Sequence, residues 1–256
     1  MIFDALTIFP GLFTAFLAES LLAKALAKGL LTFNLVNPRD FTKDKRQTVD
    51  DRPYGGGPGM VLLAEPLALA LESLSQIDPT PSHVIYLTPS GPTLTQAKVQ
   101  ELATKPRLTL VCGRYEGVDQ RFVDLFVNEE ISIGDYVVSG GEVPAMVVVE
   151  AVTRSLPGFL GQSESLREES HSYGLLEHPH YTRPKTFRGL TVPSLLLSGH
   201  HAQIAAYRLA EAMAKTRSLR PDLLLRPEFE ATALSALTRP GSPLATKTLK
   251  KRKALK

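Results

Sequence analysis

The chain has 256 residues, of which 43% are hydrophobic and 21% are charged. These fractions are typical of a globular protein, and the length suits one large domain or two of ordinary size. No apolar run approaches the roughly 18 residues that a membrane-spanning helix needs, and residues 1–13 lack the basic start and cleavage site of a signal peptide. The single cysteine, Cys112, excludes an internal disulfide and predicts a reducing, cytoplasmic location with an inert buried thiol.

The net charge of +3 is unevenly distributed along the chain. Residues 247–256 carry six basic side chains and no acidic one, so residues 1–246 have a net charge of about −3. The body of the chain is therefore not a general polyanion binder, and a nucleic-acid site must be a local patch. We expect residues 241–256 to form a disordered basic tail, with a role as an extra arm on a polyanion as the alternative.

Residues 1–157 are expected to alternate between strands and helices. Apolar patterning predicts strands at 1–9, 30–36, 83–87 and 108–112, and helices at 12–26, 65–74, 95–103 and 119–126. Thr95 is a suitable N-cap for the helix at 95–103. Strands that alternate with helices form βαβ units, which predicts an α/β fold with a mainly parallel sheet.

The segment 37–59 has no periodicity and ends in the glycine run 55–59. Connections of this length are usually functional or disordered. The glycine run does not follow a strand, and it lacks the Gly-Lys-Ser/Thr ending of a phosphate-binding loop. No Gly-x-Gly-x-x-Gly opens a helix elsewhere, which argues against an NTPase or a Rossmann dehydrogenase.

Three predicted strands or strand-like segments lead into ligand-type loops: TPSG at 88–91, GRYEG at 113–117 and IGDYVVSGG at 133–141. Such loops, at the carboxyl ends of parallel strands, form the ligand sites of open α/β sheets. A helix with an apolar stripe is predicted to begin after Gly141 and to point its first N–H groups into the same space. We interpret 129–154 as the floor of a small-molecule site, with Arg154 three turns along the helix. Two ordinary tight turns before a core helix are the alternative.

After Pro157 the sequence becomes polar, and residues 158–173 are predicted to be an interdomain linker. Beyond it we expect a small, mostly helical unit, with an apolar run at 192–197, a helix at 202–215 and two more helices ending near Arg239. Its histidines lack the partners of a zinc motif, so no metal site is predicted. A linker carboxylate could act as a base once a substrate orders it, although a solvated acidic linker explains the same residues.

Five blocks of sequence carry a resemblance to a known family: TVDDRPYGGGPGM (48–60), VCGRYEGVD (111–119), SIGDYVVSGGEVPAM (132–146), PHYTRP (179–184) and LLLSGHHAQI (195–204). In order and spacing they closely resemble the bacterial tRNA (guanine-N1)-methyltransferase family, the TrmD family of the SPOUT class. The resemblance covers residue 1 to about 240. It implies S-adenosylmethionine-dependent methylation of N1 of guanosine 37, the nucleotide 3′ of the anticodon in tRNA.

The resemblance also implies a domain organisation. Residues 1–157 would be the catalytic domain, with a deep trefoil knot that holds S-adenosylmethionine. Residues 158–173 would be the linker and residues 174–240 a helical tRNA-binding domain. The partners implied are tRNA and a second copy of the chain, in an obligate homodimer whose active sites are shared between subunits. Some family members are magnesium-dependent, and Glu116 is a reasonable place for a hard cation.

Carried over residue by residue, the resemblance implies three sets of site residues. The cofactor contacts are Tyr86, Leu87, Thr88, Pro89, Gly113, Tyr115, Glu116, Ile133, Gly134, Asp135, Tyr136, Val137, Val138, Gly140, Gly141 and Pro144. The RNA contacts are Asp50, Arg52, Gly55, Gly57, Gly59, Ser165, His180, Tyr181, Arg183 and Arg208. The catalytic residues are Arg154 and Glu169.

Glu169 departs from the family, which has an aspartate at this position. The extra methylene requires the linker to seat the carboxylate about 1 Å farther back, and placement errors of that size affect rate. Glu168 is the neighbouring alternative. We expect Glu169, contributed across the dimer, to accept the N1 proton and Arg154 to stabilise the charge that develops on O6. Another RNA methyltransferase, or a non-catalytic RNA-binding protein on the same scaffold, is the competing interpretation.

Overall fold

The computed structural model describes residues 1–160, 169–171 and 174–225. The chain divides into two compact units, Met1–Gly161 and Gln162–Lys256. The division falls inside the segment 158–173 that the sequence predicts to be a linker. Within the described residues every helix is too short or too polar to cross a lipid bilayer.

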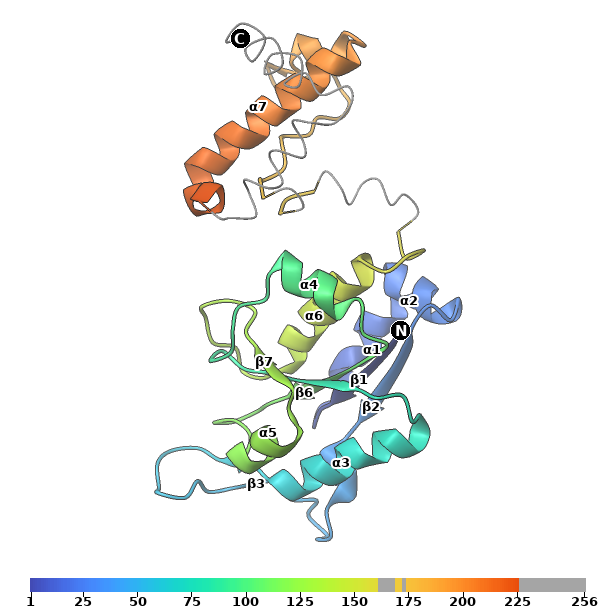
Figure 1. Cartoon of the computed structure of the whole chain (residues 1–256), viewed down its shortest axis with the longest axis vertical. Coiled ribbons are helices and arrows are strands. Elements are labelled where there is room, and N and C mark those ends of the chain that lie inside the picture. Colours follow the sequence, from blue (N-terminus) through green and yellow to red (C-terminus); the bar gives the residue numbers. More distant parts are fainter. Residues whose placement is uncertain (161–168, 172–173, 226–256) are drawn as a thin grey trace, which may run out of the picture. The chain divides into compact units, whose positions relative to one another are not determined.

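Unit 1 is built on a five-stranded sheet in the order β2-β1-β6-β5-β7 (Figure 1). Its strands are β1 (Ile2–Leu6), β2 (Thr32–Val36), β5 (His83–Leu87), β6 (Arg107–Cys112) and β7 (Glu129–Ile131). All four pairings are parallel, which confirms the predicted α/β fold with a mainly parallel sheet. The short strand β7 begins with two glutamates, so its sequence has no strand-like alternation.

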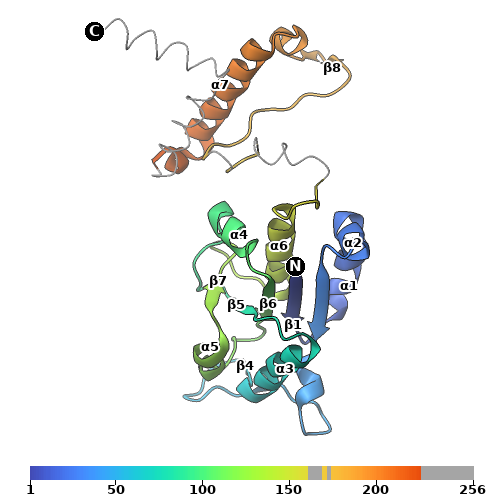
Figure 2. The ribbon, with the colours of Figure 1, turned by 45° about the vertical axis from the view of Figure 1, so that its right-hand side comes forward.

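Helices cover both faces of this sheet (Figure 2). One face carries α1 (Gly11–Ala18), α2 (Ser20–Ala27), α4 (Gln96–Leu102) and α6 (Glu142–Arg154); the other carries α3 (Ala64–Ile77) and α5 (Gln120–Phe126). Successive strand residues point to opposite faces. Phe3 and Ala5 therefore join the core under α1, α2, α4 and α6, whereas Leu6 joins the core under α3 and α5.

The single helix expected at 12–26 is wrong, because the chain breaks between α1 and α2. Glu19 is extended, with ψ 154°, and Ser20 has φ 60°. No proline or glycine marks this break in the sequence. Both helices bury apolar residues in the same core, among them Phe13 and Leu22, so the helical spacing of apolar residues continues across the interruption.

A buried ion pair connects the first strand to β6. The Arg107 side chain is 1% exposed, and its Nε donates to Oδ2 of Asp4 at 2.6 Å. Its Nη atoms donate to the carbonyls of Leu74 and Asp78 at the end of α3. Asp4 also accepts hydrogen bonds from Asn34 and Thr109, so both charges are well hydrogen-bonded in the core.

Replacing Arg107 with alanine is expected to lower the free energy of unfolding by about 3–5 kcal/mol, because Asp4 would remain buried without its counter-ion. Urea denaturation followed by far-UV circular dichroism measures this loss. Arg121→Ala is the matched control, since the Arg121–Asp119 pair lies on the surface of the same unit and should change stability by at most about 1 kcal/mol. A loss below about 1 kcal/mol for Arg107→Ala would contradict the expectation.

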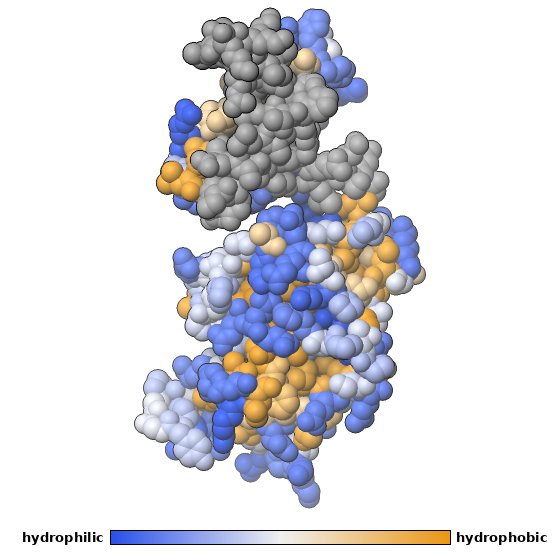
Figure 3. Space-filling model, in the orientation of Figure 1, coloured by the Kyte–Doolittle hydropathy of each residue, from blue (hydrophilic) through white to orange (hydrophobic). Residues whose placement is uncertain are grey.

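Some apolar surface of unit 1 remains accessible to solvent. On the face drawn in Figure 3, apolar side chains gather in the band between α4 and α3. Exposed apolar side chains also lie on the helices, including Leu12 of α1 and Val143 and Val147 of α6. Patches of this kind mark contact surfaces more often than isolated apolar residues do.

Unit 2 consists of a long helix with irregular segments around it. Its elements are β8 (Thr186–Phe187), β9 (Leu190–Thr191), η3 (Ser194–Leu197), α7 (His201–Leu219) and η4 (Pro221–Leu225). Residues 176–177 run against α7, since Leu176 N donates to Thr216 Oγ1 and Lys215 Nζ donates to Glu177 O. The predicted helix at 202–215 is confirmed. Of the two further helices expected before Arg239, the described residues contain only the 3-10 turn η4, and residues 226–256 lie outside the description.

Candidate functional site

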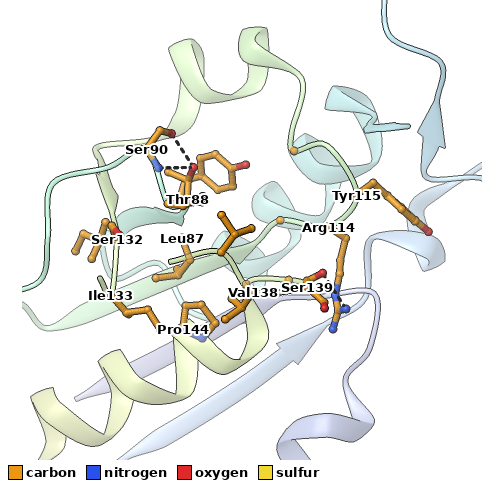
Figure 4. Close-up of a pocket in the computed structure, with 18 of the residues that line it drawn as sticks. Leu87, Thr88, Ser90, Arg114, Tyr115, Ser132, Ile133, Val138, Ser139 and Pro144 are labelled. Atoms are coloured by element: carbon orange, nitrogen blue, oxygen red, sulfur yellow. Dashed lines mark hydrogen bonds between the residues drawn. The ribbon is translucent and has the colours of Figure 1, made fainter. Parts of the chain in front are cut away.

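A cavity of about 350 Å³ lies at the carboxyl ends of β5, β6 and β7 (Figure 4). Three loops form it: the loop after β5, the loop after β6 and the loop between β7 and α6. Its lining residues are Tyr86, Leu87, Thr88, Pro89, Ser90, Gly113, Arg114, Tyr115, Glu116, Gly117, Ile131, Ser132, Ile133, Tyr136, Val137, Val138, Ser139, Gly140, Gly141 and Pro144. This is the edge of the sheet where the sequence predicts a ligand.

Backbone hydrogen bonds hold the three loops together. Thr88 N donates to Ile131 O at 3.1 Å, which joins the first loop to the end of β7. Gly141 N donates to Gly113 O at 2.8 Å, which joins the start of α6 to the second loop. Backbone hydrogen bonds therefore join three separate parts of the chain into one cavity wall.

Two glycines permit this close approach. A Cβ on Gly141 would lie 2.6 Å from Cα of Cys112 and 2.8 Å from the nitrogen of Gly113. A Cβ on Gly113 would lie 2.9 Å from Cε2 of Tyr86. Gly141 has φ −77°, so the requirement for glycine there is steric and does not arise from a left-handed backbone.

All of the residues predicted to contact a cofactor line the cavity except Gly134 and Asp135. Their role in binding remains a prediction. The cavity also has lining residues that the sequence pattern does not predict: Ser90, Arg114, Gly117, Ile131, Ser132 and Ser139. These residues lie in or beside the same three loops, and that position is the only sequence signal that could have identified them.

The cavity combines apolar walls with a few polar groups. Leu87, Ile133, Val138 and Pro144 provide apolar surface, and Figure 4 shows Leu87 and Val138 close together above α6. Polar lining residues include Thr88, Ser132 and Glu116, and the carboxylate of Glu116 lies next to Gly59. Apolar walls with a small number of placed polar groups are typical of small-molecule sites.

Burial raises the pKa of two ionisable groups at or beside the cavity. Burial raises the pKa of the Tyr86 hydroxyl above its usual value. Burial also raises the pKa of the Cys112 thiol well above its usual value, and the nearby Glu142 adds to that shift. A thiol that stays protonated is a poor nucleophile, so Cys112 is part of the core and not a reactive group.

Arg154 does not line the cavity of its own chain. It is the last residue of α6, half-buried, whereas Pro144 lines the cavity near the start of the same helix. The separation along the helix axis is about 15 Å, at 1.5 Å per residue. Glu169 belongs to unit 2 and is half-buried there. Glu168, the alternative base, lies outside the described residues, as does the predicted RNA contact Ser165.

The long segment 37–59 is more ordered than its sequence indicates. It contains the 3-10 turn η1 (Pro38–Phe41) and the strand β3 (Asp50–Asp51), which pairs with β4 (Val61–Leu62) in a hairpin. Backbone hydrogen bonds attach this hairpin to the cavity loop, from Glu116 N to Met60 O and from Leu62 N to Gly117 O, both at 2.9 Å. The predicted RNA contacts Asp50, Arg52, Gly55, Gly57 and Gly59 therefore lie on a hairpin joined to the cavity wall.

The other predicted RNA contacts lie in unit 2. His180, Tyr181, Arg183 and Arg208 are all exposed. His180 pairs with Oε1 of Glu177 at 2.7 Å, and its ring lies 4.6 Å from that of His178. Nothing in these contacts prevents the four side chains from meeting a ligand. Among the described residues, no group of three or more His, Cys, Asp or Glu side chains is placed to hold a metal ion.

Comparison with known proteins places these features in a family. The sequence model of the tRNA (Guanine-1)-methyltransferase TrmD family matches residues 1–226. The chain is 51% identical over 225 residues to the tRNA (guanine-N(1)-)-methyltransferase of Ralstonia nicotianae, covering 88% of this chain and 86% of that protein. It is 52% identical over 239 residues to the protein of the same name from Chloroflexus aggregans, covering 93% and 92%. With this family match over most of its length, the chain belongs to the tRNA (guanine-1)-methyltransferase TrmD family.

Proposed function

We propose that this chain transfers a methyl group from S-adenosylmethionine to N1 of guanosine 37 in tRNA. The observation that carries the proposal is the cavity at the carboxyl ends of β5, β6 and β7, which gathers nearly all of the cofactor contacts expected of the family. Membership of the TrmD family makes the chain a tRNA guanine-N1 methyltransferase. The cofactor and position 37 are the finer parts of the proposal.

The cavity suits S-adenosylmethionine in its chemistry. Leu87, Ile133 and Val138 offer apolar surface to the adenine ring. The hydroxyls of Thr88 and Ser132 suit the ribose, and the Glu116 carboxylate suits a cationic group. Gly113 and Gly141 leave the surrounding backbone without side chains that would push the loops apart. When bound, the cofactor supplies an electrophilic methyl group on a sulfonium.

The chain supplies proton transfer and charge stabilisation. Guanine N1 carries a proton that must leave before or as N1 is methylated, and we assign its removal to Glu169. The negative charge that develops on O6 is stabilised by the Arg154 guanidinium. The target base leaves its stack to reach the cavity, because a stacked base cannot present N1 to it.

We propose that the active site is completed by a second copy of the chain. Arg154 lies about 15 Å along α6 from the Pro144 end of its own cavity, which supports a site where a symmetry-related copy brings its Arg154 to that cavity. Val143 and Val147 form an exposed apolar strip on the same helix, with exposed fractions of 56% and 41%. A two-fold dimer would bury this strip and exchange the two arginines at once.

Several further expectations extend the same proposal. The RNA would be held by the 50–62 hairpin of unit 1 and by the exposed His180, Tyr181, Arg183 and Arg208 of unit 2, with residues 1–157 catalytic and 174–240 RNA-binding. Membership of the family is the ground on which we also propose a trefoil knot in unit 1. A magnesium ion would find one carboxylate at the cavity, Glu116, and Mg²⁺ commonly combines one or two carboxylates with waters and substrate oxygens. Action on tRNA also suggests a cytoplasmic enzyme.

The decisive measurement is transfer of labelled methyl from S-adenosylmethionine to tRNA transcripts. A transcript with guanosine at position 37 should accept label, and one with another base there should not. Label on both transcripts would identify a methyltransferase with a different target base. Binding of tRNA without any transfer would identify a non-catalytic RNA-binding protein.

A further inference from the structure

Arg114 connects four segments of the chain beside the cavity. It lies in the loop after β6, and its side chain is 20% exposed. Its Nη2 lies 2.8 Å from Oε2 of Glu142, the first residue of α6, and its Nη1 donates to the carbonyl of Ser139 at 3.2 Å. The guanidinium carbon lies 4.6 Å from the centre of the Phe9 ring. Figure 4 shows the Arg114 side chain next to Ser139 at one end of the cavity.

Glu142 anchors this arrangement from inside the core. The Glu142 side chain is fully buried, and its Oε1 accepts a hydrogen bond from Thr7 Oγ1 at 2.8 Å. Thr7 follows β1, so the contact ties the start of α6 to the end of that strand, which lies next to β6 in the sheet. The carboxylate also lies in the first turn of the helix, where negative charge is favourable. Glu142 is therefore a fixed point, and Arg114 connects it to the cavity wall at Ser139.

Gly140 provides the space for the Arg114 side chain. A Cβ at position 140 would overlap Nε, Cδ and Cζ of Arg114. Arg114 and Gly140 also form an antiparallel backbone bridge. The guanidinium thus lies directly over the backbone of residues 139–140, which line the cavity together with Val138.

The network is not fully hydrogen-bonded, and this bears on what it does. Nε of Arg114 is buried and has no hydrogen-bond partner among the described residues. Removing the charge at position 114 would leave Glu142 buried without its counter-ion, which is destabilising. Lysine at position 114 would keep a positive charge beside Glu142, so Arg114→Lys should change the position of the loop more than the stability of the fold.

We propose that Arg114 is a positioning residue for the cofactor: it holds the 138–140 wall of the cavity against the start of α6. The inference rests on the proposed use of S-adenosylmethionine. Lysine cannot replace arginine here, because a single ammonium cannot reach Glu142 and Ser139 from one planar group and stack on Phe9. Loosening this wall should weaken cofactor binding while the chemistry at the methyl group proceeds as before.

Isothermal titration of the full-length protein with S-adenosylmethionine tests the proposal. For Arg114→Lys we expect the Kd to rise at least about tenfold, with kcat at saturating substrates within about twofold of wild type. The thermal midpoint of the ligand-free variant should change no more than that of Arg121→Lys. This control alters an arginine of the next helix whose side chain is 73% exposed, and it should leave the Kd unchanged.

A second variant tests whether Arg114 acts through Glu142. Glu142→Gln keeps an acceptor for the Thr7 hydroxyl and removes the negative charge. Like Arg114→Lys, it should raise the Kd for S-adenosylmethionine. If the two residues act as one unit, the Kd of the double variant for S-adenosylmethionine should be no higher than that of the single variant with the higher Kd. Additive losses would show that Arg114 does not depend on Glu142.

Three results would overturn the inference. A Kd for Arg114→Lys within twofold of wild type would show that the wall is held without Arg114. A raised Kd accompanied by a fall in the ligand-free thermal midpoint well beyond that of Arg121→Lys would show a structural role only. Failure of the wild-type chain to bind S-adenosylmethionine would refute the proposed function, and the Arg114 inference with it.

Discussion

Replacing Glu169 or Arg154 with alanine is expected to abolish methyl transfer to tRNA while binding of S-adenosylmethionine survives. Loss of a general base lowers rates by about 10²–10⁴-fold, and loss of a charge-stabilising donor by about 10²–10³-fold. Cofactor affinity should be retained because both variants leave every residue that lines the cavity unchanged. Single-turnover methyl transfer and calorimetric titration with the cofactor measure the two quantities separately.

Glu168→Ala is the matched control, because it removes a carboxylate from the adjacent position. It should transfer methyl groups at close to the wild-type rate. If Glu168→Ala is inactive and Glu169→Ala is active, the assignment of the base to Glu169 is wrong. If both single variants retain activity, neither carboxylate is the base.

Replacing Gly141 with alanine is expected to raise the Kd for S-adenosylmethionine by at least about 100-fold, since displacements near 1 Å carry effects of this size. The added Cβ would lie 2.6 Å from Cα of Cys112, and backbone cannot move aside as a flexible side chain can. The hydrogen bond from Gly141 N to Gly113 O would be lost as the loops separate. Calorimetric titration measures the effect, with far-UV circular dichroism to confirm that the sheet and helices persist.

Gly11→Ala is the control for this substitution. A Cβ on Gly11 has nothing within 4 Å, and the residue is already helical at the start of α1. It should bind the cofactor as the wild type does. Binding by Gly141→Ala within threefold of wild type would show that the three loops can relax and that their close approach does not shape the site.

The same variants test whether the active site is shared between subunits. In a purified mixed dimer, one subunit carries Gly141→Ala and the other carries Arg154→Ala. If each cavity is completed by the Arg154 of the other subunit, one site stays intact and about half of the wild-type activity should return. If Arg154 serves the cavity of its own chain, neither site is intact and the mixed dimer should be inactive. A mixed dimer with Glu169→Ala in place of Arg154→Ala tests in the same way which subunit supplies the base.

The secondary structure of unit 1 was predictable where one physical rule dominated. Strands β5 and β6 are buried on both faces, so their sequences are mainly apolar and lie between turn signals, apart from His83, Arg107 and Thr109. Thr95 caps α4 as expected, accepting a hydrogen bond from Lys98 N. The break between α1 and α2 was not predictable, because both helices pack on one core and Ser20 carries no local signal of its left-handed conformation.

The sequence by itself determined the α/β class, the three ligand-type loops and the family, because glycines and strand ends leave local marks in the chain. Only the tertiary structure decided how those loops meet. It showed that Arg154 lies far from the cavity of its own chain and that Arg114 pairs with the buried Glu142. Arg114 lies in the loop after β6 and Glu142 begins α6, and no local propensity encodes a contact between them. Such contacts depend on which strands are neighbours in the sheet, and β6 lies beside β1 and β5 only after the chain has folded.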